Sequence, residues 1–330
     1  MAQAIGIDLG TSELRAAIFD RSVGERATIL RQGKREVRMP AAVAVDAGGH
    51  LVAGDRARRL LITRPRATIA APLGLVGRRF DELDADAWAP LTLVRDARGD
   101  ARVRLGERVF APAQLIAAQL LTLRAEIEAI LGERLPPVTL TIHAGLRDAT
   151  RRAIRDAAAI AGIEVLRLLP ATTAAALTIH AEGNLVDEPT LALCDLGGGA
   201  FTAAIVELRE GSVEALASVS VDVGGRDVDR ALADHLTVEA ARACDNEAIG
   251  DDPVARVRIR DAAEKAKIAL SSERERPVHL PFLSADEAGP KHLAARLTQG
   301  KLEALAGNLV ERCADALGRA LAASGRPADA

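Results

Sequence analysis

Cysteine is scarce in this chain, and tyrosine is absent. The three cysteines, Cys194, Cys244 and Cys313, lack the close spacing of metal ligands, and their odd number argues against a framework of disulfide bonds. This pattern favours a protein of the reducing cytoplasm. Lysine is also rare beside arginine, and we attribute this bias, like the absence of tyrosine, to genomic base composition.

Long apolar runs and an excess of positive charge are missing as well. No stretch of about 18 residues is apolar and free of charge, and the first apolar run already contains Asp8, with no basic residue before it. We therefore expect no membrane span and no export signal. The formal net charge is −3, so no overall basic surface is available to neutralise nucleic-acid phosphates. Membranes and nucleic acids are thus not expected as partners.

What the sequence does contain is one pattern written twice. Residues 4–19 read AIGIDLGTSELRAAIF, and residues 191–208 read LALCDLGGGAFTAAIVEL. In each segment two apolar runs flank a glycine turn, which predicts a β-hairpin. With 330 residues and 49% hydrophobic side chains, the chain is long enough for two lobes that each bury a core.

The segments after the two predicted hairpins follow the same order. In the first half, a long helix predicted over 113–131 leads into a strand, a helix and a strand over 138–169, which together form a βαβ unit. In the second half, the corresponding helix over 299–323 leads directly to residues 324–330. By this internal symmetry, the last βαβ unit of the second lobe is expected to be absent.

The two turns have the chemistry of a phosphate site. Glycine lets backbone N–H groups close on a phosphate without a Cβ in the way, and the aspartates before the turns, Asp8 and Asp195, are placed to hold the waters of Mg²⁺. A single such motif is more simply a tight hairpin with a solvated aspartate, but duplication at equivalent positions favours a bound Mg-nucleotide. The turn residues are Gly10, Thr11, Ser12, Gly197, Gly198 and Gly199.

At these residues the sequence resembles a known family. Segments that include IGIDLGTS, DATRRAIRDAAAIAGIEVLRLL, DLGGGAFTAAIVEL and AAEKAKIALSS are similar, in order and over nearly the whole chain, to the nucleotide-binding domain of the 70-kDa heat-shock chaperones, the DnaK family of the actin and sugar-kinase superfamily. The resemblance implies an α/β, actin-like ATPase fold. Two lobes of duplicated ribonuclease-H-like topology would flank a nucleotide cleft, the second lobe being incomplete. ATP or ADP with Mg²⁺ is the implied cofactor.

The resemblance also implies a division of the chain. Lobe I is expected over residues 1–182, lobe II, without its last βαβ unit, over 183–323, and a tail over 324–330, with no peptide-binding domain. Autonomous holding of client proteins is therefore not expected. The absent unit would uncover an apolar sheet edge, and a protein partner that covers the incomplete second lobe is a further expectation.

More nucleotide contacts are implied in the second half. Glu264, Lys267 and Ser271 are spaced three and four residues apart, which places them on one helical face. From spacing alone, that face is equally a solvated polar stripe. The resemblance implies that the three side chains contact adenine and ribose, and that the turn at Gly224 and Gly225 belongs to the same site.

The resemblance breaks down where the family holds the transferred phosphate. Its catalytic lysine and glutamate correspond to Leu73 and Ala171, and the hydroxyl and carboxylate of its second loop correspond to Ala200 and Thr202. Thr11 is the one residue that we retain as a candidate for a catalytic role. Because phosphoryl transfer depends on positioning and charge stabilisation, nucleotide binding is expected with weak or no hydrolysis, as in a pseudo-ATPase.

Several other side chains have two interpretations each. His143 stands where the family has a proline. It could act as a general base near neutral pH, but replacement of the proline by drift is favoured, because spacing identifies no partner carboxylate. Cys194, on a predicted core strand, is interpreted as a small hydrophobic residue rather than a nucleophile. Two arginine pairs, Arg78 with Arg79 and Arg151 with Arg152, could contact a partner or a carboxylate across the cleft, although a solvated surface is the simpler expectation for both.

Three functions remain open at this point. The first, which we favour, is a DnaK-like chaperone-family module that binds Mg-ATP between two lobes and hydrolyses it weakly or not at all. The second is an active ATPase or a sugar-kinase-like phosphotransferase with a rewired site. The third is a scaffold or interaction protein that works without nucleotide. Equilibrium binding of ATP separates the first from the third, and Mg-dependent turnover identifies the second.

Overall fold

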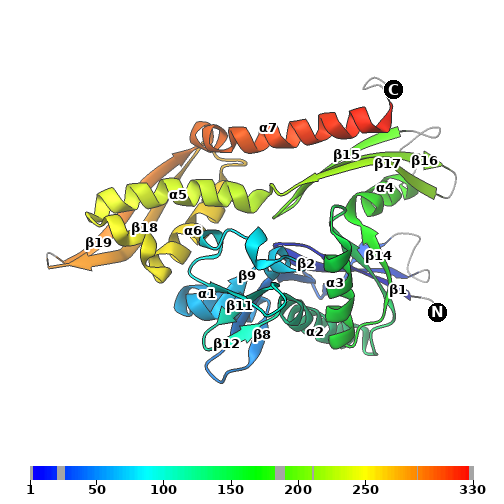
Figure 1. The fold of residues 1–330 in the computed structure, drawn as a ribbon, viewed down its shortest axis with the longest axis horizontal. Coiled ribbons are helices and arrows are strands. Elements are labelled where there is room, and N and C mark those ends of the chain that lie inside the picture. Colours follow the sequence, from blue (N-terminus) through cyan, green and yellow to red (C-terminus); the bar gives the residue numbers. More distant parts are fainter. Residues whose placement is uncertain (1–2, 21–26, 183–189, 210–211, 288, 327–330) are drawn as a thin grey trace.

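The chain forms two α/β lobes, one from each half of the sequence (Figure 1). The computed structural model describes residues 3–20, 27–182, 190–209, 212–287 and 289–326. The predicted boundary between residues 182 and 183 therefore borders a segment, 183–189, that lies outside the described residues, as do residues 327–330 of the predicted tail.

The sheet of lobe I is built around the first predicted hairpin. Its strands are β1 (Gln3–Leu9), β2 (Glu13–Asp20), β3 (Thr28–Ile29), β6 (Arg38–Pro40), β13 (Val138–Ile142) and β14 (Val165–Pro170). β1 pairs antiparallel with β2 and parallel with β13, and β13 pairs parallel with β14. With helix α3 (Asp148–Ile160) between β13 and β14, the predicted βαβ unit is confirmed.

Helix α2 (Pro112–Leu131) packs with α3 on this sheet and forms the largest core of the molecule. It starts with a proline, whose fixed φ suits the first turn, and ends at Gly132, which has a φ of 72°. Leu120 and Leu123 are fully buried together with Ile7 and Leu140 of the sheet. The predicted helix over 113–131 thus forms where the periodicity places it.

Small sheets and short helices fill the chain between β2 and α2. The strands are β4 (Arg31–Gln32), β5 (Arg35–Glu36), β7 (Ala42–Val45), β8 (Leu51–Ala53), β9 (Thr68–Ala70), β10 (Thr92–Arg95), β11 (Ala101–Leu105) and β12 (Arg108–Phe110). Helix α1 (Asp55–Thr63) packs against β7. Among the described residues, no helix is both long and apolar enough to cross a membrane.

The sheet of lobe II is built around the second predicted hairpin. Its strands are β15 (Thr190–Leu196), β16 (Phe201–Arg209) and β17 (Ser212–Val221), all antiparallel. Successive residues of β16 point to opposite faces of the sheet. Ala203 and Ile205 pack against α7 (Gln299–Ser324), whereas Ala204 and Val206 pack on the side of α4 (Ala171–Ala181). The sheet is therefore covered by a helix on each face.

One edge of the lobe II sheet lacks a neighbour. Among the described residues, β15 pairs with β16 alone, although its counterpart β1 in lobe I also pairs with β13. Leu196 is 62% exposed, and Cys194 is exposed too. The expectation that Cys194 lies in a core was wrong, because its strand is an edge strand rather than a central one.

The outer part of lobe II contains two helices and a long hairpin. α5 (Gly225–Cys244) extends beyond the predicted helix over 226–236, and α6 (Pro253–Ala269) starts after Asp252, whose side chain accepts a hydrogen bond from the Ala255 N–H at 2.6 Å. Strands β18 (Glu275–Asp286) and β19 (Gly289–Thr298) pair with each other and project from the lobe (Figure 1). Their inner side chains complete a core with α5 and α6.

The core position of α2 is tested by two neighbouring leucines. Leu120→Ala should lower the free energy of unfolding by about 2–5 kcal/mol, because it removes a fully buried side chain from lobe I. Leu121→Ala is the matched control, since Leu121 is 55% exposed and its loss should cost less than about 0.5 kcal/mol. Urea unfolding followed by circular dichroism compares the two, and equal effects would contradict this packing.

Candidate functional site

Three glycine turns meet between the lobes. The first (Gly10–Ser12) joins β1 to β2, the second (Gly197–Ala200) joins β15 to β16, and the third (Gly224–Gly225) precedes α5. A Cβ built on Gly199 would lie 2.9 Å from the Thr11 Cγ2, and one on Gly198 would overlap the Ser12 hydroxyl. The first and second turns are therefore in direct contact, and the contact requires glycine in the second.

The third turn is hydrogen-bonded to the second. The N–H of Gly225 donates to the carbonyl of Gly197 at 3.0 Å, and the N–H of Arg226 donates to the carbonyl of Gly198 at 2.9 Å. A Cβ on Gly224 would lie 2.5 Å from the backbone nitrogen of Gly199. All the turn residues that the sequence analysis selected are thus brought together in one place.

Several backbone donors of the turns have no protein acceptor. Within the described part of the chain, no hydrogen bond uses the N–H groups of Thr11, Ser12, Gly198 and Gly199. Such free N–H groups on consecutive turn residues form an anion-binding concavity. The backbone of both turns can therefore hold an anion such as a phosphate group.

Two carboxylates flank these turns. Asp8 at the end of β1 accepts a hydrogen bond from the Thr141 hydroxyl on β13 at 2.6 Å, and Asp195 at the end of β15 is partly buried. Burial raises the pKa of Asp195; the nearby His143 opposes this shift, and the charge of Asp8 adds to it. Two neighbouring carboxylates of this kind suit a cation bound between them through water. The described residues contain no group of three or more His, Cys, Asp and Glu side chains that could bind a metal ion directly.

A short chain of polar groups lies beside Asp195. The buried Thr202 hydroxyl is 2.9 Å from the Nδ1 of His143 and 3.0 Å from the Ser220 hydroxyl. Thr202 can donate to an unprotonated Nδ1 or accept from a protonated one, so the order of donors follows the tautomer of His143. Burial lowers the pKa of His143, against the charges of Asp195 and Asp222, so the ring is neutral at pH 7. This network was not predicted from the sequence.

Of the side chains predicted to contact adenine and ribose, Lys267 already has partners within the protein. The Lys267 ammonium is 2.7 Å from the carboxylate of Asp229 and donates to the Gly225 carbonyl at 3.0 Å. Lys267 therefore links α6 to the third turn. Ser271 is exposed beyond the end of α6.

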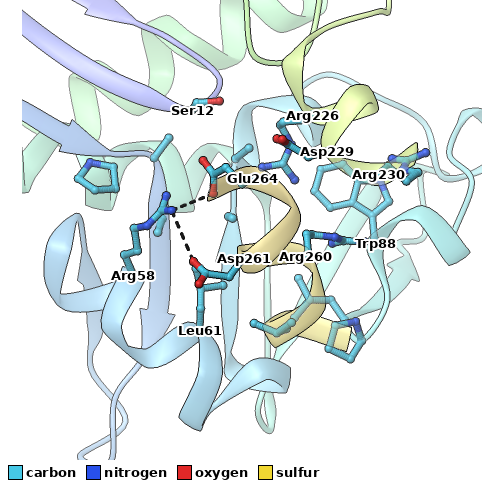
Figure 2. Close-up of a pocket in the computed structure, with 18 of the residues that line it drawn as sticks. Ser12, Arg58, Leu61, Trp88, Arg226, Asp229, Arg230, Arg260, Asp261 and Glu264 are labelled. Carbon is cyan, nitrogen blue, oxygen red and sulfur yellow. Dashed lines mark hydrogen bonds and ion pairs between the residues drawn. The ribbon is translucent and has the colours of Figure 1, made fainter. Parts of the chain in front are cut away.

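Glu264 takes part in an ion pair between the lobes. Arg58 on α1 approaches Glu264 on α6 at 2.8 Å and Asp261 at 3.9 Å, as Figure 2 shows. A second ion pair between the lobes joins Arg78 to Asp222 at 2.6 Å. Of the four arginines for which a contact across the cleft was left open, Arg78 has a carboxylate partner there, whereas Arg79 lies 3.8 Å from Asp100 of its own lobe.

The comparison with known families settles the relationship of the chain. A family model described as Hsp70 protein matches residues 4–329. The chain belongs to the Hsp70 family. The fold is accordingly the actin-like ATPase fold that the resemblance implied, and the chain corresponds to the nucleotide-binding module of the Hsp70 family. Domains of this family generally bind ATP or ADP with Mg²⁺.

Four of the positions where this Hsp70-family chain departs from the resemblance lie together on one side of the cleft, whereas Ala171 is the first residue of α4. Leu73, His143 and Ala200 line one pocket together with Thr11 of the first turn, and Thr202 lies behind His143. Leu73 and Ala200 thus give this pocket apolar groups and His143 gives it an imidazole, while its two arginines, Arg78 and Arg147, are paired with Asp222 and Glu82.

The contact between His143 and Asp195 can be tested by titration. Asp195→Asn should lower the pKa of His143 further, because the negative charge of Asp195 stabilises the imidazolium. Asp222→Asn should lower it by a smaller amount. NMR titration of the histidine ring carbons gives the values, with His143→Gln identifying the signal. An unchanged or higher pKa in Asp195→Asn would rule out this electrostatic contact.

Proposed function

We propose that the chain is an Hsp70-family module that binds Mg-ATP or Mg-ADP between its lobes and hydrolyses ATP weakly or not at all. The observation that carries the proposal is the set of free N–H groups on the first and second turns beside two carboxylates. Backbone N–H groups on glycine turns bind phosphates because no Cβ limits their approach.

Each part of the site has a role in this proposal. The turns at Gly10–Ser12 and Gly197–Gly199 hold the phosphates, while Asp8 and Asp195 orient the waters of the metal. Mg²⁺, when bound, neutralises part of the phosphate charge. Contacts to adenosine are proposed for Gly224, Gly225, Glu264, Lys267 and Ser271.

Binding on this proposal requires the lobes to separate slightly. Ser12 and Thr11 lie against the glycines of the second turn, so a phosphate chain enters between the turns only when this contact opens. Glu264 must also give up part of its ion pair with Arg58 to contact a nucleotide. Both costs reduce the affinity, since an ordered contact must be broken before binding.

Weak hydrolysis is proposed because of the side chains beside the expected position of the terminal phosphate. Leu73 cannot neutralise developing negative charge, and Thr202 is a buried hydroxyl already bonded to His143 and Ser220. A rewired ATPase remains the second candidate, because a neutral His143 beside Asp195 has a lone pair that can accept a proton. A scaffold that works without nucleotide is the third.

The proposal also includes a protein partner and a location in the cytoplasm. The free edge of β15, with Leu196 and Cys194 exposed along it, supports a protein partner that covers this side of lobe II. The three unpaired cysteines of the sequence support a location in the reducing cytoplasm.

Nucleotide binding is tested with one glycine variant and its control. Gly198→Val should abolish the binding of ATP and ADP in the presence of Mg²⁺, because the new side chain would overlap Ser12 and displace the turn. Gly318→Ala on α7 should bind like the wild type, since nothing lies within 4 Å of a Cβ there. Calorimetry measures both. If the wild type gives no heat with millimolar nucleotide, the scaffold hypothesis replaces this proposal.

Hydrolysis is tested by single-turnover measurement with labelled ATP. Each missing electrostatic group typically costs on the order of 3 kcal/mol in the transition state, or about a hundredfold in rate, although such effects do not add. With Leu73, Ala171 and Thr202 in place, near-background turnover is expected. A rate ordinary for the family, lost in both Asp195→Asn and His143→Gln, would identify a rewired ATPase instead.

A further inference from the structure

A second pocket lies between the lobes, on the side of the first turn that carries Ser12. Its wall from lobe I is mostly apolar and includes Leu61 and Trp88, and its wall from lobe II carries Arg226, Arg230 and Arg260 (Figure 2). The cavity itself has a volume of about 150 Å³, and a wider space around it is continuous with solvent. A cavity of about this volume holds one aromatic ring.

The three arginines reach the pocket from two packed helices. Arg226 and Arg230 lie one turn apart on α5, and Arg260 lies on α6, which packs against α5. Among the described residues, no carboxylate oxygen lies within 4.0 Å of any of these three guanidinium groups. Three cations therefore share one wall without a direct counter-ion.

The carboxylates that line the same pocket already have partners. Asp229 pairs with Lys267 at 2.7 Å, and Glu264 pairs with Arg58 at 2.8 Å. Asp261 pairs with Lys265 at 2.6 Å. Each of these carboxylates is thus compensated by a cation other than the three arginines.

A neighbouring hollow contains further carboxylates. Asp84, Asp86 and Asp234 line it together with Arg230 and Arg260, yet within the described ranges none of them forms an ion pair with either arginine. These carboxylates moderate the positive potential without neutralising it. The guanidinium groups keep their donors available to a ligand.

The grouping of the arginines has an electrostatic cost. Burial and the positive charges of Arg226, Arg230 and Arg256 lower the pKa of Arg260 to about 10. Arg260 is still charged at neutral pH, so the repulsion persists in the ligand-free protein. An anion bound among the three groups would remove this repulsion.

Trp88 provides the apolar side of the same pocket. It is the one tryptophan of the chain, and its ring lies over Gly74, where a Cβ would come within 3.1 Å of the ring. Figure 2 shows Trp88 at the same end of the pocket as Arg230 and Arg260, although they belong to opposite walls. A flat apolar group can therefore pack on the pocket wall while an attached anion faces the arginines.

We propose that this pocket binds a small phosphorylated molecule, with its phosphate held by Arg226, Arg230 and Arg260 and its apolar body packed against Trp88. A guanidinium offers two parallel N–H donors that match phosphate oxygens, and three such groups suit a dianion. Ser12 and Glu264 also line this pocket, so it borders the proposed nucleotide site, but its phosphate would be held by arginines and not by the glycine turns.

Phenyl phosphate is the probe for this site, and Trp88 is the reporter. Because the chain has one tryptophan and no tyrosine, its intrinsic emission above about 300 nm on selective excitation comes from this pocket. Titration should give a saturable change in emission. Arg230→Gln and Arg260→Gln should each weaken binding about tenfold or more, because each removes charge-assisted hydrogen bonds.

Control variants and a neutral probe distinguish binding in this pocket from binding elsewhere on the protein. Arg258 also lies on α6, but its side chain donates to the Phe282 carbonyl and does not line the pocket. Binding of phenyl phosphate to Arg258→Gln should therefore stay within about twofold of wild type. Benzyl alcohol, which lacks the anion, should give no saturable change. Arg230 is exposed, so its variant tests the site even if Arg260→Gln fails to fold.

Three results would overturn the proposal. They are the absence of a saturable change, an equal response to benzyl alcohol, and unchanged binding in folded Arg230→Gln. Because the nucleotide proposal is tested by calorimetry with ATP and ADP, and this one by Trp88 emission with phenyl phosphate, failure of either proposal is recognised separately.

Discussion

The contact between the first and second glycine turns is the constraint on which the arrangement of the lobes depends. The two hairpins are repeats, but their tips differ. The first tip carries the side chains of Thr11 and Ser12, whereas the second has Gly198 and Gly199, so the side chains of one tip fit against the bare backbone of the other. Side chains on both tips would keep the lobes apart. The tips of the sequences DLGTS and DLGGG therefore have complementary shapes.

Ion pairs between the lobes lie on two sides of this contact. Arg58 with Glu264 borders the pocket that contains Trp88, and Arg78 with Asp222 lines the pocket that contains His143. All four side chains are partly exposed, and such pairs contribute about 0–1 kcal/mol each. Ion pairs of this strength orient the lobes but are weak enough to break, so the cleft can open.

The hairpins, the βαβ unit and the long helices could be predicted because their signals are local. Glycine turns between apolar runs and helical periodicity each lie within about 20 residues. The β18–β19 hairpin gave no such signal, since Pro277, Pro281 and Pro290 interrupt it. A two-stranded ribbon tolerates prolines that a central strand would not, because both strands have a free edge.

Contacts in the site depended on residues far apart in the sequence. Thr141 bonds to Asp8 from 133 residues away, and Arg58 pairs with Glu264 from 206 residues away. Residues this far apart form no local pattern, so a single sequence does not show that they are in contact. The two turns were identifiable because both copies of the motif carry Asp-Leu-Gly between apolar runs. Their hydrogen-bond partners were not, because folding brings them in from other elements.

The distribution of charge in the cleft connects these observations. The pocket lined by Thr11, Leu73 and His143 also contains Arg78 and Arg147, but each is paired with a carboxylate, Asp222 and Glu82 respectively. The His143 ring in the same pocket is neutral at pH 7. The unpaired guanidinium groups line the other pocket, beyond Ser12. A cation stabilises a transferred phosphate only when it is positioned at the charge that develops. The separation of the anion-binding backbone from the unpaired arginines is therefore one reason for proposing that the cleft binds phosphates and hydrolyses them weakly.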